Sequence, residues 1–264
     1  MKDIVLFDMD GTLSEPRQSI ESPICNTLSK LLEKAEVGIV TGSDVNYLFE
    51  QSKKLLELIS RQHANANKLV LMPCNGTKLY RWRESGSWIL EKETNIKHQI
   101  GESNFRQLMC SILSLQSSLA RQYYIPLTGH FVQYRDSMVN WCPIGRNAAN
   151  EQREYFCALD EEKGIRDRYI NFLRRELKSW GLTDLEVALG GSTSFDIYPT
   201  GWDKTYALKH FPDHDLIWFV GDKCDENGND KSLYDFLRTT GTSFKTESPN
   251  QTIDIINKKI SPFL

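Results

Sequence analysis

The chain alternates between strand and helix patterns at both ends, and a long middle block interrupts the alternation. Near the start, short apolar runs typical of buried strands are separated by helical patterns; the runs lie at residues 4–7, 37–40 and 69–72, and the helical patterns at 27–33 and 44–59. After Pro199 the alternation returns, with an apolar run at 216–220 between helical segments. This order predicts an α/β fold with a parallel sheet.

The middle block has strand pairs and helices without the alternation. We expect a hairpin around Gly86, helices at 105–124 and 165–180, and strands at 130–134, 138–142, 186–189 and 195–198. Such a mixture is typical of an α+β domain. We therefore predict a core domain made of residues 1–82 and 198–264, with an inserted domain at 83–197.

Two carboxylates follow the first strand. Asp8 and Asp10 are two positions apart and are followed by Gly11 and Thr12. In extended backbone such side chains point the same way, so they repel each other unless a cation lies between them. They can hold Mg²⁺, or one can act as a nucleophile and the other as an acid/base. The simpler interpretation is an acidic turn after a strand, but ligands bind at this end of the strands in open α/β sheets.

Five later residues have the chemistry to complete that site. Thr41 and Ser43 follow a buried strand and offer hydroxyl groups to a phosphoryl oxygen, unless one of them only caps a helix. Lys204 can neutralise Asp8 and a bound phosphate, although a lone lysine at a helix start is usually solvated. Asp222 follows the strongest apolar run and can complete an oxygen cage with Asp230, which can also cap a helix. The candidate metal ligands are therefore Asp8, Asp10, Asp222 and Asp230.

The inserted block carries a second set of polar residues. Arg135, Arg146 and Arg153 can bind phosphate oxygens bidentately. Ser194 and Asp196, two apart on a predicted strand, can bond to sugar hydroxyls. The alternative is a set of surface salt bridges in a chain rich in acidic residues.

Composition restricts the class of protein. A formal net charge of −3 argues against general nucleic-acid binding. The six cysteines include no CxxC pair, which favours reduced thiols over a zinc site or a disulfide framework. We expect no signal peptide before the first strand, no membrane span and a cytoplasmic location.

These motifs together resemble the eukaryotic-type phosphomannomutases of the haloacid dehalogenase superfamily. The resemblance covers nearly the whole chain in order, through Phe7-Asp8-Met9-Asp10-Gly11-Thr12-Leu13, Pro16-Arg17-Gln18, Gly42-Ser43-Asp44, Asn75-Gly76, Pro143-Ile144-Gly145-Arg146, Gly190-Gly191, Ser194-Phe195-Asp196, Gly201-Trp202-Asp203-Lys204, Gly221-Asp222-Lys223 and Gly228-Asn229-Asp230.

The resemblance implies a haloacid dehalogenase-like Rossmannoid core that is catalytic, and an α+β cap that binds substrate. It implies Asp8 as nucleophile, Asp10 as acid/base and Asp222 as a metal ligand. It also implies that six residues contact the phosphosugar: Arg17, Arg135, Arg146, Arg153, Ser194 and Asp196. The implied cofactors are Mg²⁺ and a hexose 1,6-bisphosphate activator, and the implied assembly is a homodimer through the caps.

The expected activity is the interconversion of mannose 6-phosphate and mannose 1-phosphate through a phospho-aspartyl enzyme and a hexose bisphosphate, feeding GDP-mannose synthesis. Three positions depart from the family pattern: Thr41 replaces Gly, Cys74 replaces Glu, and Phe236 replaces a carboxylate of a second metal loop. Thr41 is more like the sugar phosphatases of the superfamily, so a Mg²⁺-dependent sugar-phosphate phosphatase is one alternative. A non-catalytic sugar-phosphate-binding protein is another, against which the retained acidic set argues.

Overall fold

The protein divides into two compact units. The computed structural model describes residues 2–61, 65–83, 86–226 and 228–264. The core unit comprises Met1–Glu93 and Trp202–Leu264, and the cap unit comprises Thr94–Gly201. The division differs from the predicted boundaries mainly at residues 83–93, which we assigned to the cap and which belong to the core unit.

A seven-stranded sheet forms the centre of the core unit, in the order β11-β10-β1-β2-β3-β4-β5. Its first five strands are parallel, and the hairpin β4–β5 adds two antiparallel strands at one edge. The strands are β1 (Asp3–Phe7), β2 (Glu36–Val40), β3 (Leu69–Met72), β4 (Lys78–Arg83), β5 (Ser87–Glu93), β10 (Leu216–Gly221) and β11 (Ser243–Lys245). The hairpin pairs with β3, and for that reason residues 83–93 belong to the core unit.

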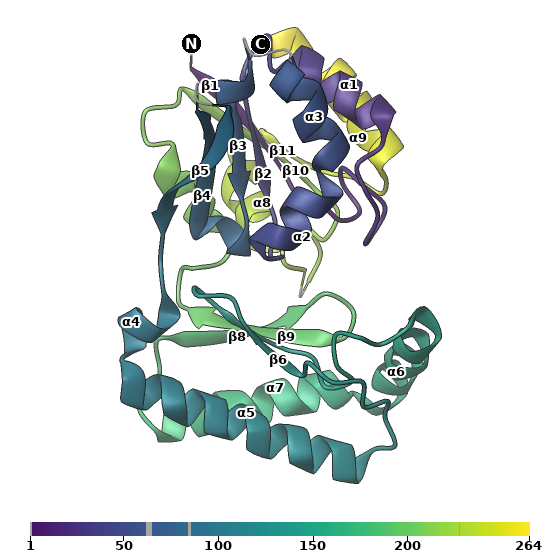
Figure 1. Cartoon of the computed structure of the whole chain (residues 1–264), viewed down its shortest axis with the longest axis vertical. Helices are drawn as coiled ribbons and strands as arrows, with labels where there is room; N and C mark the ends of the chain where they lie inside the picture. Colours follow the sequence, from purple (N-terminus) through teal and green to yellow (C-terminus); the bar gives the residue numbers. More distant parts are fainter. Residues whose placement is uncertain (1, 62–64, 84–85, 227) are drawn as a thin grey trace. The chain divides into compact units, whose positions relative to one another are not determined.

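Helices cover both faces of this sheet (Figure 1). One face packs against α1 (Ser22–Leu31), α2 (Val45–Gln51), α3 (Lys53–Arg61) and α9 (Pro249–Ile255), and the other against α8 (Lys231–Arg238) and the 3₁₀ segment η3 (Lys204–His210). Short helical segments complete the unit: η1 (Ala66–Lys68), η2 (Cys74–Gly76), η4 (Ile256–Ile260) and η5 (Ser261–Phe263). The strands β1, β2 and β3 are buried almost throughout, on both faces, which explains their continuous apolar runs in the sequence.

The helix predicted at 44–59 is two helices. The Asp44 carboxylate accepts the backbone N–H of Tyr47 at 3.0 Å and begins α2. The chain turns at Ser52 before α3 begins. Leu48 faces the core from α2, and Leu55, Leu56 and Ile59 face it from α3, so the apolar positions were predicted correctly although the break was not.

The cap unit is an antiparallel sheet with helices on one face. The sheet order is β6-β7-β9-β8, with strands β6 (Val132–Tyr134), β7 (Val139–Trp141), β8 (Leu185–Gly190) and β9 (Ser194–Pro199). The helices are α4 (Ile96–Ile100), α5 (Glu102–Gln122), α6 (Asn150–Lys163) and α7 (Ile165–Ser179). Figure 1 shows α5 and α7 beside the cap sheet. Trp141 and Phe195, whose rings stack at 4.5 Å, belong to the hydrophobic cluster that includes residues of α5 and α7.

Strand alternation leaves a polar row on the other face of the cap sheet. Gln133 pairs with Asn140, and Asn140 pairs with Asp196. Because successive side chains of a strand point to opposite faces, this row lies opposite the row that contains Trp141 and Phe195. The cap sheet therefore has an apolar face against its helices and a polar face away from them.

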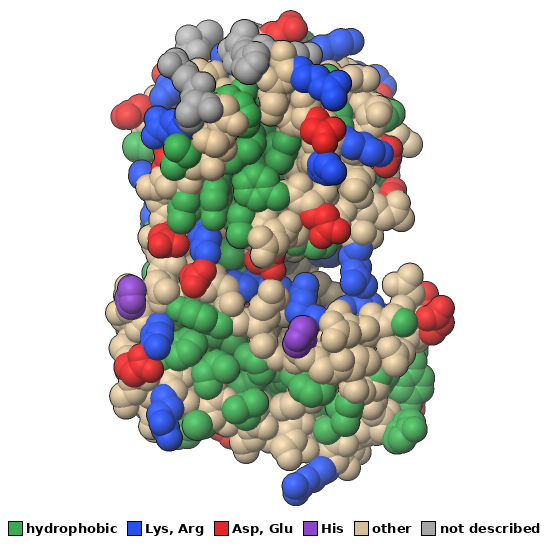
Figure 2. Space-filling view, in the orientation of Figure 1, with side chains coloured by type: hydrophobic (Ala, Val, Ile, Leu, Met, Phe, Trp, Pro, Cys, Tyr) green, Lys and Arg blue, Asp and Glu red, His purple; other side chains and the backbone are tan. Residues whose placement is uncertain are grey.

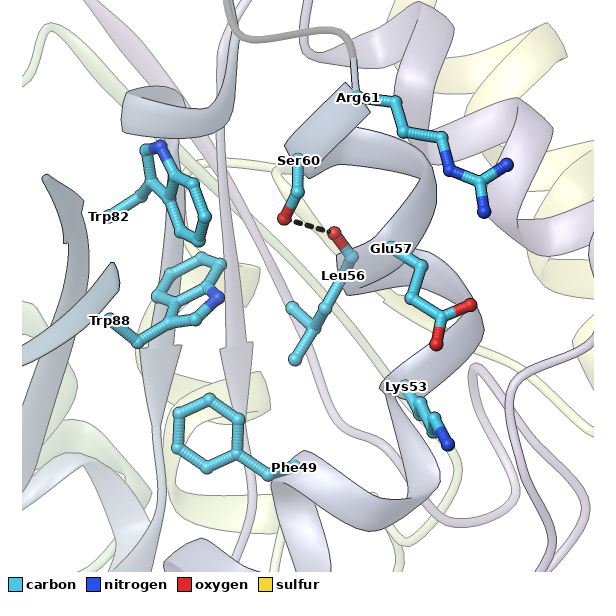
Figure 3. A pocket seen from close by; sticks show the side chains of 8 residues that line it. All are labelled: Phe49, Lys53, Leu56, Glu57, Ser60, Arg61, Trp82 and Trp88. Carbon is cyan, nitrogen blue, oxygen red and sulfur yellow. Dashed lines mark hydrogen bonds between the residues drawn. The ribbon is translucent and has the colours of Figure 1, made fainter. Parts of the chain in front are cut away.

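A surface hollow of the core unit is lined by residues of α2, α3, β4 and β5. It measures about 560 Å³ and is lined by Phe49, Lys53, Leu56, Glu57, Ser60, Arg61, Trp82 and Trp88. Figure 3 shows the two indoles and the Phe49 ring on one side and α3 on the other, and Figure 2 shows hydrophobic side chains gathered on this face. None of the candidate site residues lines it. In the described parts of the chain, no helix is long and apolar enough to cross a membrane.

Candidate active site

The candidate residues of the core unit follow neighbouring parallel strands. Asp8 follows β1, Thr41 follows β2 and Asp222 follows β10. The backbone N–H of Asp8 donates to the carbonyl of Val220 at 3.0 Å, which extends the β1–β10 pairing to the nucleophile candidate. The carboxyl ends of these strands lie side by side, so residues far apart in the sequence meet at the carboxyl end of the sheet.

Lys204 lies fully buried between two carboxylates. Its Nζ donates hydrogen bonds to Oδ1 of Asp8 and to Oδ1 of Asp230, and neither Lys204 nor Asp230 has exposed surface. Asp230 is itself oriented, because its Oδ2 accepts the backbone N–H of Lys223 at 2.9 Å. A buried ammonium group with two carboxylate partners is an internal counter-ion rather than the solvated lysine of the simpler interpretation.

The group nevertheless contains more negative than positive charge. Ligand oxygens of Asp8, Asp222 and Asp230 lie within 4.8 Å of one another. Burial, with the nearby charge of Asp230, raises the pKa of Asp8 from 3.8 to about 8, although Lys204 opposes this rise. Burial also raises the pKa of Asp222. The carboxylates raise the pKa of Lys204 despite its burial, so the lysine stays charged. A further cation is needed to keep all three carboxyl groups ionised.

Several details fit a hard metal ion. Asp222 Oδ1 is buried and has no hydrogen-bond partner among the described residues, and the same holds for Asn229 Oδ1. A Cβ atom at Gly11, where φ is +87°, would lie 2.3 Å from Asp222 Oδ2, and one at Gly221 would lie 2.7 Å from Asp230 Oδ2. Both positions need glycine. An all-oxygen set of this kind is what Mg²⁺ prefers.

Asp10 is held separately from this group. Its Oδ1 accepts two hydrogen bonds, from the Arg17 backbone N–H at 2.8 Å and from the Tyr47 hydroxyl at 2.6 Å. Arg17 adopts a left-handed backbone conformation with φ of 64°, which costs about 1–2 kcal/mol in a residue other than glycine. Burial and the hydrogen bond to Asp10 raise the pKa of Tyr47. Nothing in the sequence pointed to Tyr47, which lies on the first turn of α2.

Thr41 and Ser43 belong to a loop tied to the next loop of the sheet. The Ser43 N–H donates to the Thr41 hydroxyl at 3.1 Å. The Asn75 N–H donates to the Thr41 carbonyl at 2.8 Å, and the Cys74 N–H to the Ser43 carbonyl at 2.9 Å. Cys74 and Asn75 both have positive φ, 51° and 60°. The loop that contains Cys74 and Asn75 thus fixes the backbone of Thr41 and Ser43, and the Ser43 N–H orients the Thr41 hydroxyl.

The polar face of the cap sheet holds one arginine through a chain of amide and carboxylate groups. Arg146 donates from a terminal guanidinium nitrogen to Asn140 Oδ1 at 3.2 Å, and Asn140 Nδ2 donates to Asp196 Oδ1 at 2.7 Å. Arg135, which is largely buried, donates from Nε to Gln133 Oε1 at 3.1 Å. The side-chain alternation of strands 130–134 and 138–142 is the sequence signal that locates Gln133 and Asn140 on this face.

Arg153 braces the loop that carries Arg146. It donates to the Arg146 carbonyl at 3.3 Å, to the Ala148 carbonyl at 3.1 Å and to the Thr193 hydroxyl at 2.9 Å. Ser194 is buried at the start of β9 and pairs with Gly190. These contacts join α6 to the loop before β9.

Comparison with known proteins identifies the family. Residues 24–262 match the model of the eukaryotic phosphomannomutase family. The chain is 36% identical to "Phosphomannomutase 2" of Dictyostelium discoideum over 96% of its own length and 95% of the relative. It is 34% identical to the phosphomannomutase of Saccharomyces cerevisiae over 97% of its own length and 93% of the relative.

The chain belongs to the eukaryotic phosphomannomutase family. Its fold is similar to that of a Plasmodium falciparum IMP-nucleotidase in a structure with bound IMP, with a TM-score of 0.69 at 15% identity over 100% of this chain and 67% of that one. The predicted haloacid dehalogenase-like fold, with a parallel-rich core sheet and an α+β insertion, is confirmed.

The expected residues of this family member fall into two groups. In the core unit, Lys204 is bonded to Asp8, and Asp8, Asp222 and Asp230 lie close enough to hold one metal ion. The Arg17 backbone N–H is bonded to Asp10, beside Tyr47. The cap unit contains Arg135, Arg146, Arg153, Ser194 and Asp196. Asp10 is not in the group of three carboxylates. Phe236 is 62% exposed on α8, and the described residues contain no second acidic, His or Cys cluster of three.

Proposed function

We propose that the protein is a phosphomannomutase, which interconverts mannose 6-phosphate and mannose 1-phosphate. The observation that carries this proposal is the buried Asp8–Lys204–Asp230 group beside Asp222, in a chain of this family. A carboxylate with a buried ammonium partner is suited to attack a phosphoryl group, because the positive charge offsets repulsion between two anions.

The first half-reaction transfers a phosphoryl group to Asp8. Lys204 occupies Oδ1 of Asp8, which leaves Oδ2 to form the new bond to phosphorus. As the bond between phosphorus and the sugar oxygen breaks, Asp10 gives its proton to that oxygen. The donor in this step is a hexose 1,6-bisphosphate, so the products are a phospho-aspartyl enzyme and a hexose monophosphate.

The second half-reaction transfers the phosphoryl group from Asp8 to the free 1- or 6-hydroxyl of a hexose monophosphate and so forms the bisphosphate again. Asp10, now ionised, takes the proton of that hydroxyl as its oxygen bonds to phosphorus, and the acyl phosphate bond of Asp8 breaks. A hexose 1,6-bisphosphate primes the cycle, because it can phosphorylate Asp8 and leave a monophosphate behind. The hydroxyl groups of Thr41 and Ser43 donate hydrogen bonds to phosphoryl oxygens in both directions.

Mg²⁺ is the metal that Asp8, Asp222 and Asp230 suit. When bound it supplies the positive charge that lets the crowded carboxylates ionise and that shields the phosphoryl oxygens. The buried, unpaired Oδ1 of Asp222 supports this assignment. Asp10 contributes its carboxyl to proton transfer, since two donors already fix one of its oxygens.

The cap anchors the phosphate that is not reacting. Arg146 and Arg135 would bind its oxygens, with Asp196 and Ser194 near the sugar hydroxyls and Arg17 contributing from the core unit. Arg153 acts mainly by holding the Arg146 loop, as its bonds to the backbone of that loop suggest. A cationic anchor can accept either phosphate of a bisphosphate, which a mutase requires and a simple phosphatase does not.

Thr41 favours one other function, a Mg²⁺-dependent sugar-phosphate phosphatase on the same fold. Its hydroxyl, positioned in the loop after β2, places a polar group where the family usually has none.

We further propose that the protein forms a homodimer through the caps and that its product feeds GDP-mannose synthesis. We also propose a cytoplasmic location, which six free thiols support.

A coupled mutase assay tests the proposal. Mannose 1-phosphate and glucose 1-phosphate are compared with Mg²⁺, with and without a hexose 1,6-bisphosphate. We expect isomerisation that depends on the bisphosphate and exceeds phosphate release. Release of inorganic phosphate without isomerisation would identify the phosphatase instead. If neither occurs while hexose phosphates still bind, the chain is a sugar-phosphate-binding protein.

A further inference from the structure

We propose that Tyr47 is a positioning residue for Asp10. The Tyr47 hydroxyl holds the Asp10 carboxyl group in the orientation needed for proton transfer. The inference deepens the proposed function and rests on it. Tyr47 Oη lies 2.6 Å from Asp10 Oδ1 although the two residues are 37 positions apart. A tyrosine hydroxyl is protonated at neutral pH, so it donates this hydrogen bond to the carboxylate.

Two donors converge on the same oxygen of Asp10. The Arg17 backbone N–H also donates to Oδ1, at 2.8 Å. Among the described residues no donor reaches Oδ2 of Asp10. The two bonds therefore stop rotation of the carboxyl group and make Oδ2 the oxygen that carries and exchanges the proton. Fixing that oxygen matters because proton transfer falls off steeply when donor and acceptor are misplaced.

Tyr47 is itself held firmly. Its backbone N–H donates to the Asp44 carboxylate at 3.0 Å, the N-terminal cap of α2. Its ring packs against the hydrophobic cluster of the core unit. Helix α2, which begins just after Thr41 and Ser43, thus positions the Tyr47 hydroxyl beside Asp10. The segment after β2 therefore contributes groups both to the phosphoryl oxygens and to the acid/base.

The leaving group provides the test, because a good leaving group departs without a proton. Tyr47→Phe removes the hydroxyl and keeps the ring. With mannose 1-phosphate and the bisphosphate activator, whose leaving oxygen needs the proton of Asp10, we expect kcat to fall about ten- to a hundredfold. KM should stay within about twofold, since Tyr47 need not contact the sugar. With acetyl phosphate, whose acetate leaves unprotonated, the burst of acetate released on phosphorylation of Asp8 should change less than about twofold.

Tyr234→Phe, on α8 of the same unit, is the matched control, and we expect it to leave both rates unchanged. Equal losses on mannose 1-phosphate and acetyl phosphate, or no loss on either, overturn the role of Tyr47. A wild-type protein that releases acetate in a burst but does not isomerise hexose phosphates overturns the proposed function, and with it this inference. Melting curves of both variants serve to separate a loss of folded protein from a loss of rate.

Discussion

The candidate sites of the core and cap units differ in the sign of their charged side chains. In the core unit, three carboxylates lie close together, and the buried Lys204 pairs with two of them, Asp8 and Asp230. In the cap unit, Arg135 and Arg146 donate to the neutral side chains of Gln133 and Asn140, and one candidate carboxylate, Asp196, lies at the end of the chain of bonds. The core site is thus rich in carboxylates, and the cap site is rich in arginine.

The difference indicates what each site binds. A group of buried carboxylates becomes stable when a cation enters, whereas the guanidinium groups of arginines suit the oxygens of an anion. A divalent metal ion provides the cation, and a phosphate ester provides the anion. Four predictions test this contrast between the units, in order of decreasing effect.

Asp8→Asn should abolish turnover of hexose phosphates and of acetyl phosphate, because an amide cannot form the acyl phosphate. The fold should survive, since the change removes one of several crowded negative charges. Activity assays and melting curves without metal check both points. Asp225→Asn, which alters an exposed pair with Lys245, is the control. Retention of more than a trace of activity by Asp8→Asn would remove Asp8 as the nucleophile.

Lys204→Met should lower the free energy of unfolding by about 3–5 kcal/mol, because Asp8 and Asp230 lose their buried counter-ion. Urea unfolding without metal measures the loss, and added Mg²⁺ should recover part of it. The surface variant Lys245→Met should lose little. Similar losses in the two variants would contradict an internal counter-ion role for Lys204.

Arg146→Ala should weaken turnover of hexose phosphates but spare acetyl phosphate, which has no second phosphate to anchor. A hydrogen bond to a charged group is worth about 1.5–3 kcal/mol, so kcat/KM for mannose 1-phosphate should fall accordingly. Arg106→Ala, on α5, provides a cap control. Equal losses with both substrates would mean that Arg146 supports the fold or the core site.

The stability of the metal-free protein should fall as pH rises from about 4 to about 8. The pKa of Asp8 is raised on folding from 3.8 to about 8, so the folded state binds more protons than the unfolded state in this window. Mg²⁺ should therefore raise Tm more at pH 8 than at pH 5, by about 2–4 °C, the effect of 1 kcal/mol in a chain of this size. A Tm gain from Mg²⁺ that is equal at both pH values would contradict this prediction, and Asp8→Asn should show a smaller difference.

Elements with a clear apolar period were predicted well. The runs at 4–7, 37–40, 69–72 and 216–220 are strands β1, β2, β3 and β10, because a strand buried on both faces is apolar throughout. The helix α6 (Asn150–Lys163) was missed. Phe156 is its buried residue, so the segment has little apolar period to recognise.

The domain to which the edge strands β4 and β5 belong could not be predicted from the local sequence pattern. The hairpin β4–β5 was recognised, but whether it belonged to the core or to the insertion depended on its pairing with β3. Hairpins form from local turn signals, and the sheet that a hairpin joins is decided by long-range contacts. The predicted boundary at residue 82 therefore differed from the observed one at 93.

The sequence by itself placed the candidate residues Asp8, Thr41 and Asp222 at the carboxyl end of the core sheet, because each follows an apolar run that predicts a parallel strand. Only the tertiary structure decided which atoms meet. It buried Lys204 between Asp8 and Asp230, and it brought the Tyr47 hydroxyl to Asp10. Spacing along the chain fixes the direction of side chains within one element, whereas hydrogen bonds between elements depend on the packing of the whole core.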